Sequence, residues 1–213
     1  MIFGKIDYIN LLPFYIWTKK NIKNSQFKQI MNYKKDFPSS INKAFKKRKI
    51  DAAFISSIES ARGNFTTLDI GIVANKEIKS VLVKKGTFEA DPHSATSNLL
   101  AQKLNIQGQV IIGDKALKLY IKDPSTYIDL AREWNKKHQV PFVFARLCVN
   151  KNRLFYHKLS KKFLKSKVKI PSYILNEYAL SREIPKKEIL NYLNLVSYDI
   201  GTKAKRGLKR FLG

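Results

Sequence analysis

The stretch FPSSINKAFKKRKIDAAFISSIESARGN, residues 37–64, decides which fold class the sequence predicts. Its first half is expected to form a helix, because Ser39 or Ser40 can act as the N-cap and apolar residues recur at helical spacing from Ile41 onward. The apolar run IDAAFIS that follows is typical of a short buried strand, and SIESARGN resembles one further helical turn. A strand that directly follows a helix indicates an α/β protein.

The segments on either side of this stretch extend the α/β pattern. Residues 2–6 are expected to form a first strand, so that strand, helix and strand follow one another as a βαβ unit, which favours a parallel sheet. Two further strands are expected at LDIGIVAN (68–75) and KSVLVKKG (79–86). A helix then begins in SATSNLLAQKL, where Thr96 or Ser97 can act as the cap.

The rest of the chain adds a second α/β unit and a helical tail. QVIIGD (109–114) is an expected strand, and YIDLAREWNKKHQV (127–140) is an expected helix. PFVFARLCVN (141–150) is long and apolar, as expected for a strand that returns to the first unit. From Leu154 to the end the pattern predicts helices alone.

This order predicts a two-lobed α/β architecture with a cleft between the lobes. Lobe one is expected to be discontinuous, built from residues 1–84 and 143–213, and lobe two is expected over residues 85–142. Two antiparallel connecting strands between such lobes describe a hinged protein that binds its ligand in the cleft.

The charge is high, but its distribution favours a solvated basic surface. The net charge is +25, with 33 lysines and eight arginines spread along the chain. Arginine is the residue that base and phosphate recognition favours, so nucleic-acid binding is the less favoured interpretation. A small anionic substrate would still be attracted to such a field.

Other features indicate a protein of the cytoplasm. Cys148 is the single cysteine, so an internal disulfide is excluded. No stretch is long and apolar enough to cross a bilayer, and Lys5 and Asp7 would interrupt the apolar region of an export signal. An amphipathic segment around Phe155 could touch a membrane surface, although a helix that covers lobe one fits it better. Stable membrane association is therefore not expected.

Asn10, near the end of the first expected strand, is the first candidate for a site residue. Ligands of open α/β sheets lie beyond the carboxyl ends of the strands, where an amide offers one donor and one acceptor without charge. The alternative is an asparagine that bonds its own backbone in the turn before Pro13.

Hydroxyl side chains at other strand and helix ends are further candidates. Ser56 and Ser57 follow the second strand, and Ser80 begins the strand that leaves lobe one. Each of these serines could instead be a routine helix cap.

The run HSATSN, directly before an expected helix, is a candidate anion site. Thr96, Ser97 and the amide of Asn98 can point N–H groups at an anion, with the helix dipole adding to the attraction. A plain N-cap explains the same residues.

Several kinds of chemistry find no support in the sequence. His93, His138 and His157 are scattered and lack metal-ligand spacing, so no metal site is expected. No glycine-rich phosphate loop is present, so no nucleotide cofactor is expected. Cys148 lies within an apolar strand, where burial makes a thiol a poor nucleophile. His93 is either a base close to the anion site or an exposed loop residue.

Seven strings together resemble the chorismate dehydratase family of the futalosine route to menaquinone. In family order they are GKIDYINLLPFY (4–15), DAAFISSIESAR (51–62), IKSVLV (78–83), SATSNLL (94–100), VIIGDKAL (110–117), DLAREWNKKHQVPFVFA (129–145) and YDIGTKAKRGLKRFL (198–212). They span nearly the whole chain. The resemblance implies the type 2 periplasmic-binding-protein fold, which agrees with two lobes and a cleft.

The resemblance also implies an activity and roles for particular residues. Chorismate, a dianion, would lose water to give 3-[(1-carboxyvinyl)oxy]benzoate without metal or cofactor. Asn10 and Ser80 match the family's site positions and are expected to hold the reacting groups of the substrate. The hydroxyls of the HSATSN run would bind a carboxylate, and Asp114 is expected to fix loops rather than to transfer protons. We hypothesise that a carboxylate of the substrate takes the C3 proton.

Two other functions remain open at this point. Dihydroxynaphthoate synthase, a later enzyme of the same route, is expected to share the fold, but VIIGDKAL and EW…PFVFA favour the dehydratase. A non-catalytic small-anion-binding protein is the alternative of another class, although such binders usually work outside the cytoplasm. The sequence leaves the oligomeric state open.

Overall fold

Two β-sheets organise the chain. The computed structural model describes the backbone of residues 1–213 and every side chain except those of residues 32 and 33. The larger sheet has the strand order β1 (Phe3–Gly4), β2 (Ala52–Ser56), β7 (Phe142–Val149), β3 (Thr66–Ala74) and β8 (Val196–Asp199). The smaller sheet has the order β5 (Gly108–Ile112), β4 (Val81–Lys85) and β6 (Tyr127–Asp129). We name the part built on the larger sheet lobe one and the part built on the smaller sheet lobe two.

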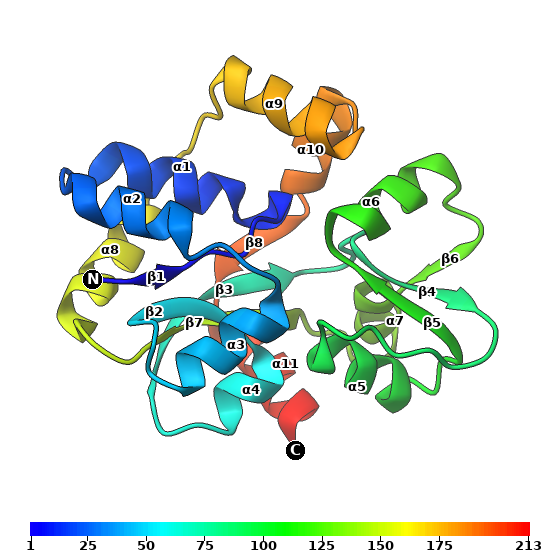
Figure 1. The fold of residues 1–213 in the computed structure, drawn as a ribbon. Helices are drawn as coiled ribbons and strands as arrows, with labels where there is room; N and C mark the ends of the chain where they lie inside the picture. Colours follow the sequence, from blue (N-terminus) through cyan, green and yellow to red (C-terminus); the bar gives the residue numbers. More distant parts are fainter.

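Helices surround both sheets (Figure 1). Those of lobe two are α5 (Ala95–Lys103), α6 (Gly113–Lys122) and α7 (Leu130–His138). Lobe one carries the short 3-10 helix η1 (Ile9–Leu11) and the helices α1 (Leu12–Asn21), α2 (Ser25–Tyr33), α3 (Pro38–Lys46), α4 (Ser57–Ala61), α8 (Arg153–Leu164), α9 (Ser172–Arg182), α10 (Lys186–Leu193) and α11 (Thr202–Leu212). Figure 1 shows the lobes side by side, with α9 leaning over from lobe one toward α6.

The larger sheet is mixed rather than parallel. β1 and β2 are parallel, as the βαβ pattern predicts. β7 runs antiparallel to both β2 and β3, and β8 runs antiparallel to β3. The parallel pairing that the βαβ unit predicts therefore holds for β1 and β2, whereas β7 returns from lobe two and runs antiparallel to both of its neighbours.

The change from one sheet to the other occurs between Ala74 and Val81. All of β4 pairs within the smaller sheet, with β5 on one side and β6 on the other. The predicted boundary after residue 84 therefore falls inside β4, and the predicted boundary after residue 142 falls one residue into β7.

Several expected element ends differ in the structure. α3 begins at Pro38 with Phe37 as N-cap, because proline needs no partner for a missing N–H, and so neither Ser39 nor Ser40 caps it. Ser94 caps α5 by accepting a hydrogen bond from the Ser97 amide, so the expected caps lie inside the first turn.

Two predicted helices are shorter than expected, because strands interrupt them. Residues 127–129 form β6, and α7 starts only at Leu130. In the tail, β8 separates α10 from α11, so the prediction of helices alone was wrong there. α2 was not predicted.

An aromatic core fixes the chain on both sides of η1. Phe3 of β1 and Phe14 of α1 have ring centroids 5.7 Å apart, and Phe54 of β2 lies 5.0 Å from Phe14. Phe163 of α8 packs on Phe14 from the other side at 5.2 Å. Such pairs contribute about 0.5–1.5 kcal/mol each beyond the area they bury. The segment between residues 4 and 12 is thus held at its two ends by the core.

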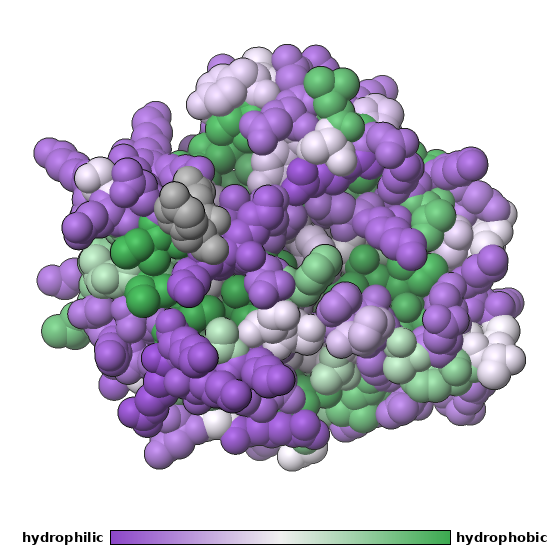
Figure 2. Space-filling model, viewed as in Figure 1, coloured by the Kyte–Doolittle hydropathy of each residue, from purple (hydrophilic) through white to green (hydrophobic). Residues whose placement is uncertain are grey.

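The face of the molecule seen in Figure 2 is mostly hydrophilic. Figure 2 shows hydrophilic side chains over most of one face, with apolar side chains gathered in small patches. None of the helices in the described part of the chain is long and apolar enough to span a membrane. Cys148 is fully buried and unpaired.

Candidate active site

A cavity between the two lobes brings together polar residues that are far apart in the sequence. The space inside it, counted together with the open solvent at its mouth, is about 650 Å³. Apolar side chains such as Phe54, Ile72 and Phe144 form much of its wall. Polar side chains reach it from lobe one (Tyr8, Asn10, Ser56) and from lobe two or the entry to it (Ser80, His93, Ser94, Ser97). Among the described lining residues, none is Lys, Arg, Asp or Glu.

Asn10 lines this cavity from η1 rather than from a strand end. β1 ends at Gly4, and the chain runs on through Tyr8 before η1 begins. The Tyr198 hydroxyl donates a hydrogen bond of 2.7 Å to the Asn10 carbonyl, which fixes the backbone. In the described hydrogen bonds the Asn10 side-chain amide does not bond its own turn, and it lies next to the Tyr192 hydroxyl in the cavity wall.

The start of α6 holds the segment that carries Asn10. The Ile9 amide donates a hydrogen bond of 3.0 Å to Asp114 Oδ1. Gly113 has a φ of +73°, and a Cβ there would lie 2.8 Å from the Tyr8 ring. Glycine is therefore required by both backbone conformation and close approach. The strings YIN and GD, far apart in the sequence, are packed against each other.

Ser80 also lines the cavity and is almost fully buried. Its Oγ lies 2.8 Å from the Tyr192 hydroxyl of α10. Burial raises the pKa of Tyr192 well above its ordinary value, while hydrogen bonding with Ser80 and with Asn10 acts in the opposite direction. The phenol is therefore neutral at physiological pH and connects the two predicted residues. Sequence reasoning missed Tyr192, because NYLNLV carries no motif.

Of the two serines at the end of β2, Ser56 in the strand and Ser57 directly after it, only Ser56 lines the cavity. Its Oγ accepts a hydrogen bond of 3.2 Å from the Asn42 side chain. Ser57 is fully buried, and its hydroxyl donates to the Val143 carbonyl at 2.5 Å. Ser57 therefore joins α4 to β7 and does not line the cavity.

The HSATSN run is divided between the cavity and the scaffold. Ser97 lines the cavity and accepts a hydrogen bond of 2.7 Å from Ser94 Oγ. Thr96 Oγ1 accepts from the Ile58 amide at 3.2 Å and so connects α5 to α4 across the lobes. The Asn98 side chain bonds both backbone groups of Asp91 and lies outside the cavity lining.

Asp114 lies behind the cavity wall rather than in it. Its carboxylate accepts from the Ile9 amide and lies 3.3 Å from Arg182 Nε. Burial raises the pKa of Asp114 to about 6, although the Ile9 amide and the Arg182 guanidinium lower it. Arg182 was not anticipated from the sequence.

His93 closes the cavity on the side of α3. Its ring stacks on Phe37 with centroids 4.5 Å apart, and its Nδ1 lies 3.0 Å from Ser39 Oγ. The ring is thus engaged with lobe one while it also lines the cavity. Within the described residues, no group of three or more His, Cys, Asp or Glu side chains is placed to hold a metal ion.

The fold and the interlobe cavity define the class of protein, a two-lobed binding-protein fold. The AF1704 protein of Archaeoglobus fulgidus is similar over 98% of this chain and 94% of its own, with a TM-score of 0.68 at 13% identity. The periplasmic aliphatic sulphonate binding protein SsuA of Escherichia coli is similar over 100% of this chain and 85% of its own, with a TM-score of 0.58 at 11% identity. At such identities these likenesses concern the fold alone, and they confirm the predicted periplasmic-binding-protein-like architecture.

Sequence relatives give the family. A family described as menaquinone biosynthesis matches residues 87–213. The chorismate dehydratase of Campylobacter jejuni subsp. jejuni serotype O:23/36 (strain 81-176) is 57% identical over 215 residues, which cover 100% of this chain and 96% of that protein. The chain therefore belongs to the menaquinone-biosynthesis family that includes this chorismate dehydratase, and the resemblance found in the sequence is confirmed.

Proposed function

We propose that the protein is a chorismate dehydratase, a hydro-lyase that removes water from chorismate to give 3-[(1-carboxyvinyl)oxy]benzoate. The 57% identity to the Campylobacter jejuni enzyme over the whole chain is the observation that carries this assignment. The cavity adds support, because Asn10 and Ser80, the two matched positions, both line it.

The reaction depends more on how the substrate is oriented than on strongly acidic or basic side chains. The C3–H bond breaks, its electron pair completes the aromatic ring, and the C4 hydroxyl leaves with the proton as water. We assign Asn10 and Ser80 to holding the C4 hydroxyl or the enolpyruvyl carboxylate, since each can donate and accept without charge. The neutral lining is consistent with a carboxylate of the substrate taking the C3 proton.

The first turn of α5 is our candidate for the second carboxylate contact. Ser94 and Ser97 line the cavity at this helix N-terminus, where amide groups and the helix dipole favour an anion. Lys43 and Lys46 lie around the adjoining hollow next to His93. Together with the net charge of +25, they would attract a dianion toward the cleft.

We place the enzyme in the futalosine route, in the cytoplasm, with no cofactor and no stable membrane association. We also propose that residues 1–80 and 142–213 on one side, and 81–141 on the other, close on the substrate as lobes, so that β4 moves as a whole with the second. The resemblance of the sequence to the family and the single buried cysteine support this placement.

Turnover of chorismate tests the proposal directly. We expect loss of chorismate and appearance of the enolpyruvyl benzoate on chromatography, with a strong decrease in Asn10→Ala. Asn176→Ala, on the exposed face of α9, is the matched control and should leave turnover unchanged. Saturable chorismate binding without turnover would indicate an anion-binding protein instead. If the protein neither binds chorismate nor turns it over, the assignment is refuted.

A further inference from the structure

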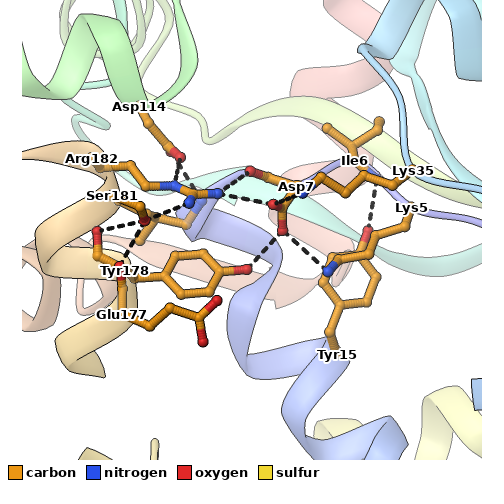
Figure 3. Close-up of polar contacts among 11 residues, drawn as sticks. Lys5, Ile6, Asp7, Tyr15, Lys35, Asp114, Glu177, Tyr178, Ser181 and Arg182 are labelled. Carbon is orange, nitrogen blue, oxygen red and sulfur yellow. Dashed lines mark hydrogen bonds and ion pairs between the residues drawn. The ribbon is translucent and has the colours of Figure 1, made fainter. Parts of the chain in front are cut away.

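Outside the cavity, the Asp114 carboxylate of lobe two is bound by two groups of lobe one. Figure 3 shows Asp114 and Asp7 on either side of the Arg182 guanidinium. Both described partners of the Asp114 carboxylate come from lobe one, namely the Ile9 amide at 3.0 Å and Arg182 Nε at 3.3 Å. The Asp114 side chain is only 15% exposed. A single carboxylate thus joins α6 to both η1 and α9.

Arg182 itself is anchored firmly in lobe one. Its Nη2 donates to Asp7 Oδ2 at 2.9 Å and to the Asp7 carbonyl at 3.2 Å. Its guanidinium carbon lies 4.3 Å from the centroid of the Tyr178 ring. A charge-assisted, stacked arginine of this kind has little rotational freedom. The Arg182 guanidinium is therefore already held in the orientation in which it contacts Asp114.

Asp7 is in turn held as an anion by several donors. Lys5 and Lys35 lie 3.2 and 2.9 Å from its carboxylate, and the Tyr178 hydroxyl donates at 2.7 Å. Although burial raises the pKa of Asp7, hydrogen bonds from Lys35, Tyr178 and Lys5 outweigh it and hold that pKa well below the ordinary range. Asp7 therefore stays ionised at all working pH values and keeps Arg182 in place.

We propose that Arg182 and Asp114 form an interlobe clasp that positions Asn10 in the closed cavity. The clasp residues are Asp7, Asp114 and Arg182, and none of them lines the cavity. Asp114 accepts a hydrogen bond from the amide of Ile9, the residue before Asn10. The contact that closes the lobes therefore also fixes the position of Asn10. Arg182 is a positioning residue in this scheme. Its kinetic consequence rests on the proposed function, but its structural consequence does not.

An ion pair between the same two helices offers a built-in comparison. Lys118 of α6 and Glu183, directly after α9, pair at 2.8 Å, with side chains 44% and 76% exposed. Exposed pairs of this kind are worth about 0–1 kcal/mol. Lys118→Gln therefore removes a contact between the same elements without touching the Ile9 amide.

The clasp predicts a particular pattern in the kinetics. Arg182→Met should lower kcat roughly 10- to 100-fold per folded molecule, since loss of one member of a buried charge pair is strongly unfavourable. Arg182→Lys should recover part of that loss, and Lys118→Gln should stay within about twofold of the unsubstituted enzyme. A kcat for Arg182→Met equal to that of Lys118→Gln would overturn the proposal.

The pH dependence of kcat gives a second test. A residue with a merely structural role would leave this dependence unchanged. The charged and titratable groups that face Asp114 are Arg182 and Tyr178 of α9, Asp7 and Tyr8 before η1, and Tyr192 of α10. Protonation of Asp114, whose pKa is about 6, weakens the clasp, so kcat should fall below about that pH. Asp114→Asn should abolish this limb and His93→Gln should retain it. A limb that persists in Asp114→Asn contradicts the clasp.

A distance measurement tests the clasp without any turnover. Spin labels on Asn176→Cys in α9 and Lys122→Cys in α6 report the separation of the lobes, and the native Cys148 is too buried to be labelled. We expect one short distance population that Arg182→Met shifts to longer values and Lys118→Gln leaves unchanged. Unchanged distances in Arg182→Met would refute the clasp even in a protein that turns over chorismate. A shift without turnover would support the clasp and reject the function.

Discussion

The two sides of the cleft are closed by contacts of opposite kinds. On the α6 side, Arg182 and Asp114 form a charged, largely buried contact at 3.3 Å that is continuous with the Asp7 network. On the α3 side, His93 stacks on Phe37, a side chain that is 56% exposed. Buried charge pairs fix geometry strongly, whereas exposed aromatic contacts contribute little and open easily. The comparison distinguishes a positioning side, at the clasp, from a substrate-access side, at His93.

The same contrast explains why the cavity itself carries no fixed charge. The described charged groups near it are directed to the clasp behind η1 and to the surface beyond His93. Within the cavity, neutral hydroxyl and amide groups face an apolar wall. A dianion in such a site keeps its own carboxylates basic, because no cation neutralises them, and this suits a reaction in which the substrate supplies the base.

Removal of Ser80 should produce the largest effect and tests whether the entry to lobe two contributes to the chemistry. Ser80→Ala should lower kcat about 10²- to 10³-fold, as loss of one preorganised polar group to the reacting atoms does. Tyr192→Phe removes the hydroxyl that faces Ser80 and should lower kcat only about tenfold. Steady-state kinetics with chorismate measure both, and circular dichroism checks the fold. Equal effects would assign the chemistry to Tyr192 instead.

The next largest effect concerns the pH dependence of stability. The folded protein raises the pKa of Asp114 from 3.8 to about 6, so the folded state binds this proton more tightly than the unfolded state. Its contribution to the free energy of unfolding is complete below about pH 4 and is lost as pH rises through about 6, by up to about 3 kcal/mol. The ionised clasp is thus gained at the expense of stability.

Chemical denaturation between pH 4.5 and 8 measures this effect. The unfolding free energy of the unsubstituted protein should decline relative to that of Asp114→Asn as pH rises across this interval. Asp7, whose pKa lies below the ordinary range, loses its contribution only at lower pH and does not interfere. A constant difference between the two proteins would mean that Asp114 is not buried as a strained anion, and the contrast between the two sides of the cleft would weaken.

Local patterns in the sequence predicted the fold class and part of the site. The βαβ order near residue 50 and the return strand PFVFARLCV sufficed for two lobes with a cleft. Asn10 and Ser80 were candidates because of their places at strand ends, the family strings added roles for them, and both line the cavity. Side-chain direction was not predictable in the same way. Ser57 and Thr96 look like ligand-binding hydroxyls, yet their oxygens bond the Val143 carbonyl and the Ile58 amide.

Contacts between distant parts of the chain could not be predicted from the sequence. Arg182 lies 68 residues from Asp114 and 175 from Asp7, and SREIP reads as an ordinary helix end. Tyr192 is 112 residues from Ser80. β8 was missed for a related reason, because four residues gain their strand conformation only from pairing with β3. Long-range partners decide these features, and local propensity does not encode them.

The smallest effect is expected on the access side of the cleft. Phe37→Ala removes the ring that stacks on His93 but leaves the hydrogen bond between His93 and Ser39. An exposed aromatic pair contributes about 0.5–1.5 kcal/mol, so KM should change by less than about tenfold while kcat stays within about twofold. If this side instead governed catalysis, kcat would fall as in Arg182→Met, and the division between a positioning side and an access side would have to be abandoned. Parallel kinetics of Phe37→Ala and Arg182→Met therefore decide which contact sets the closed geometry.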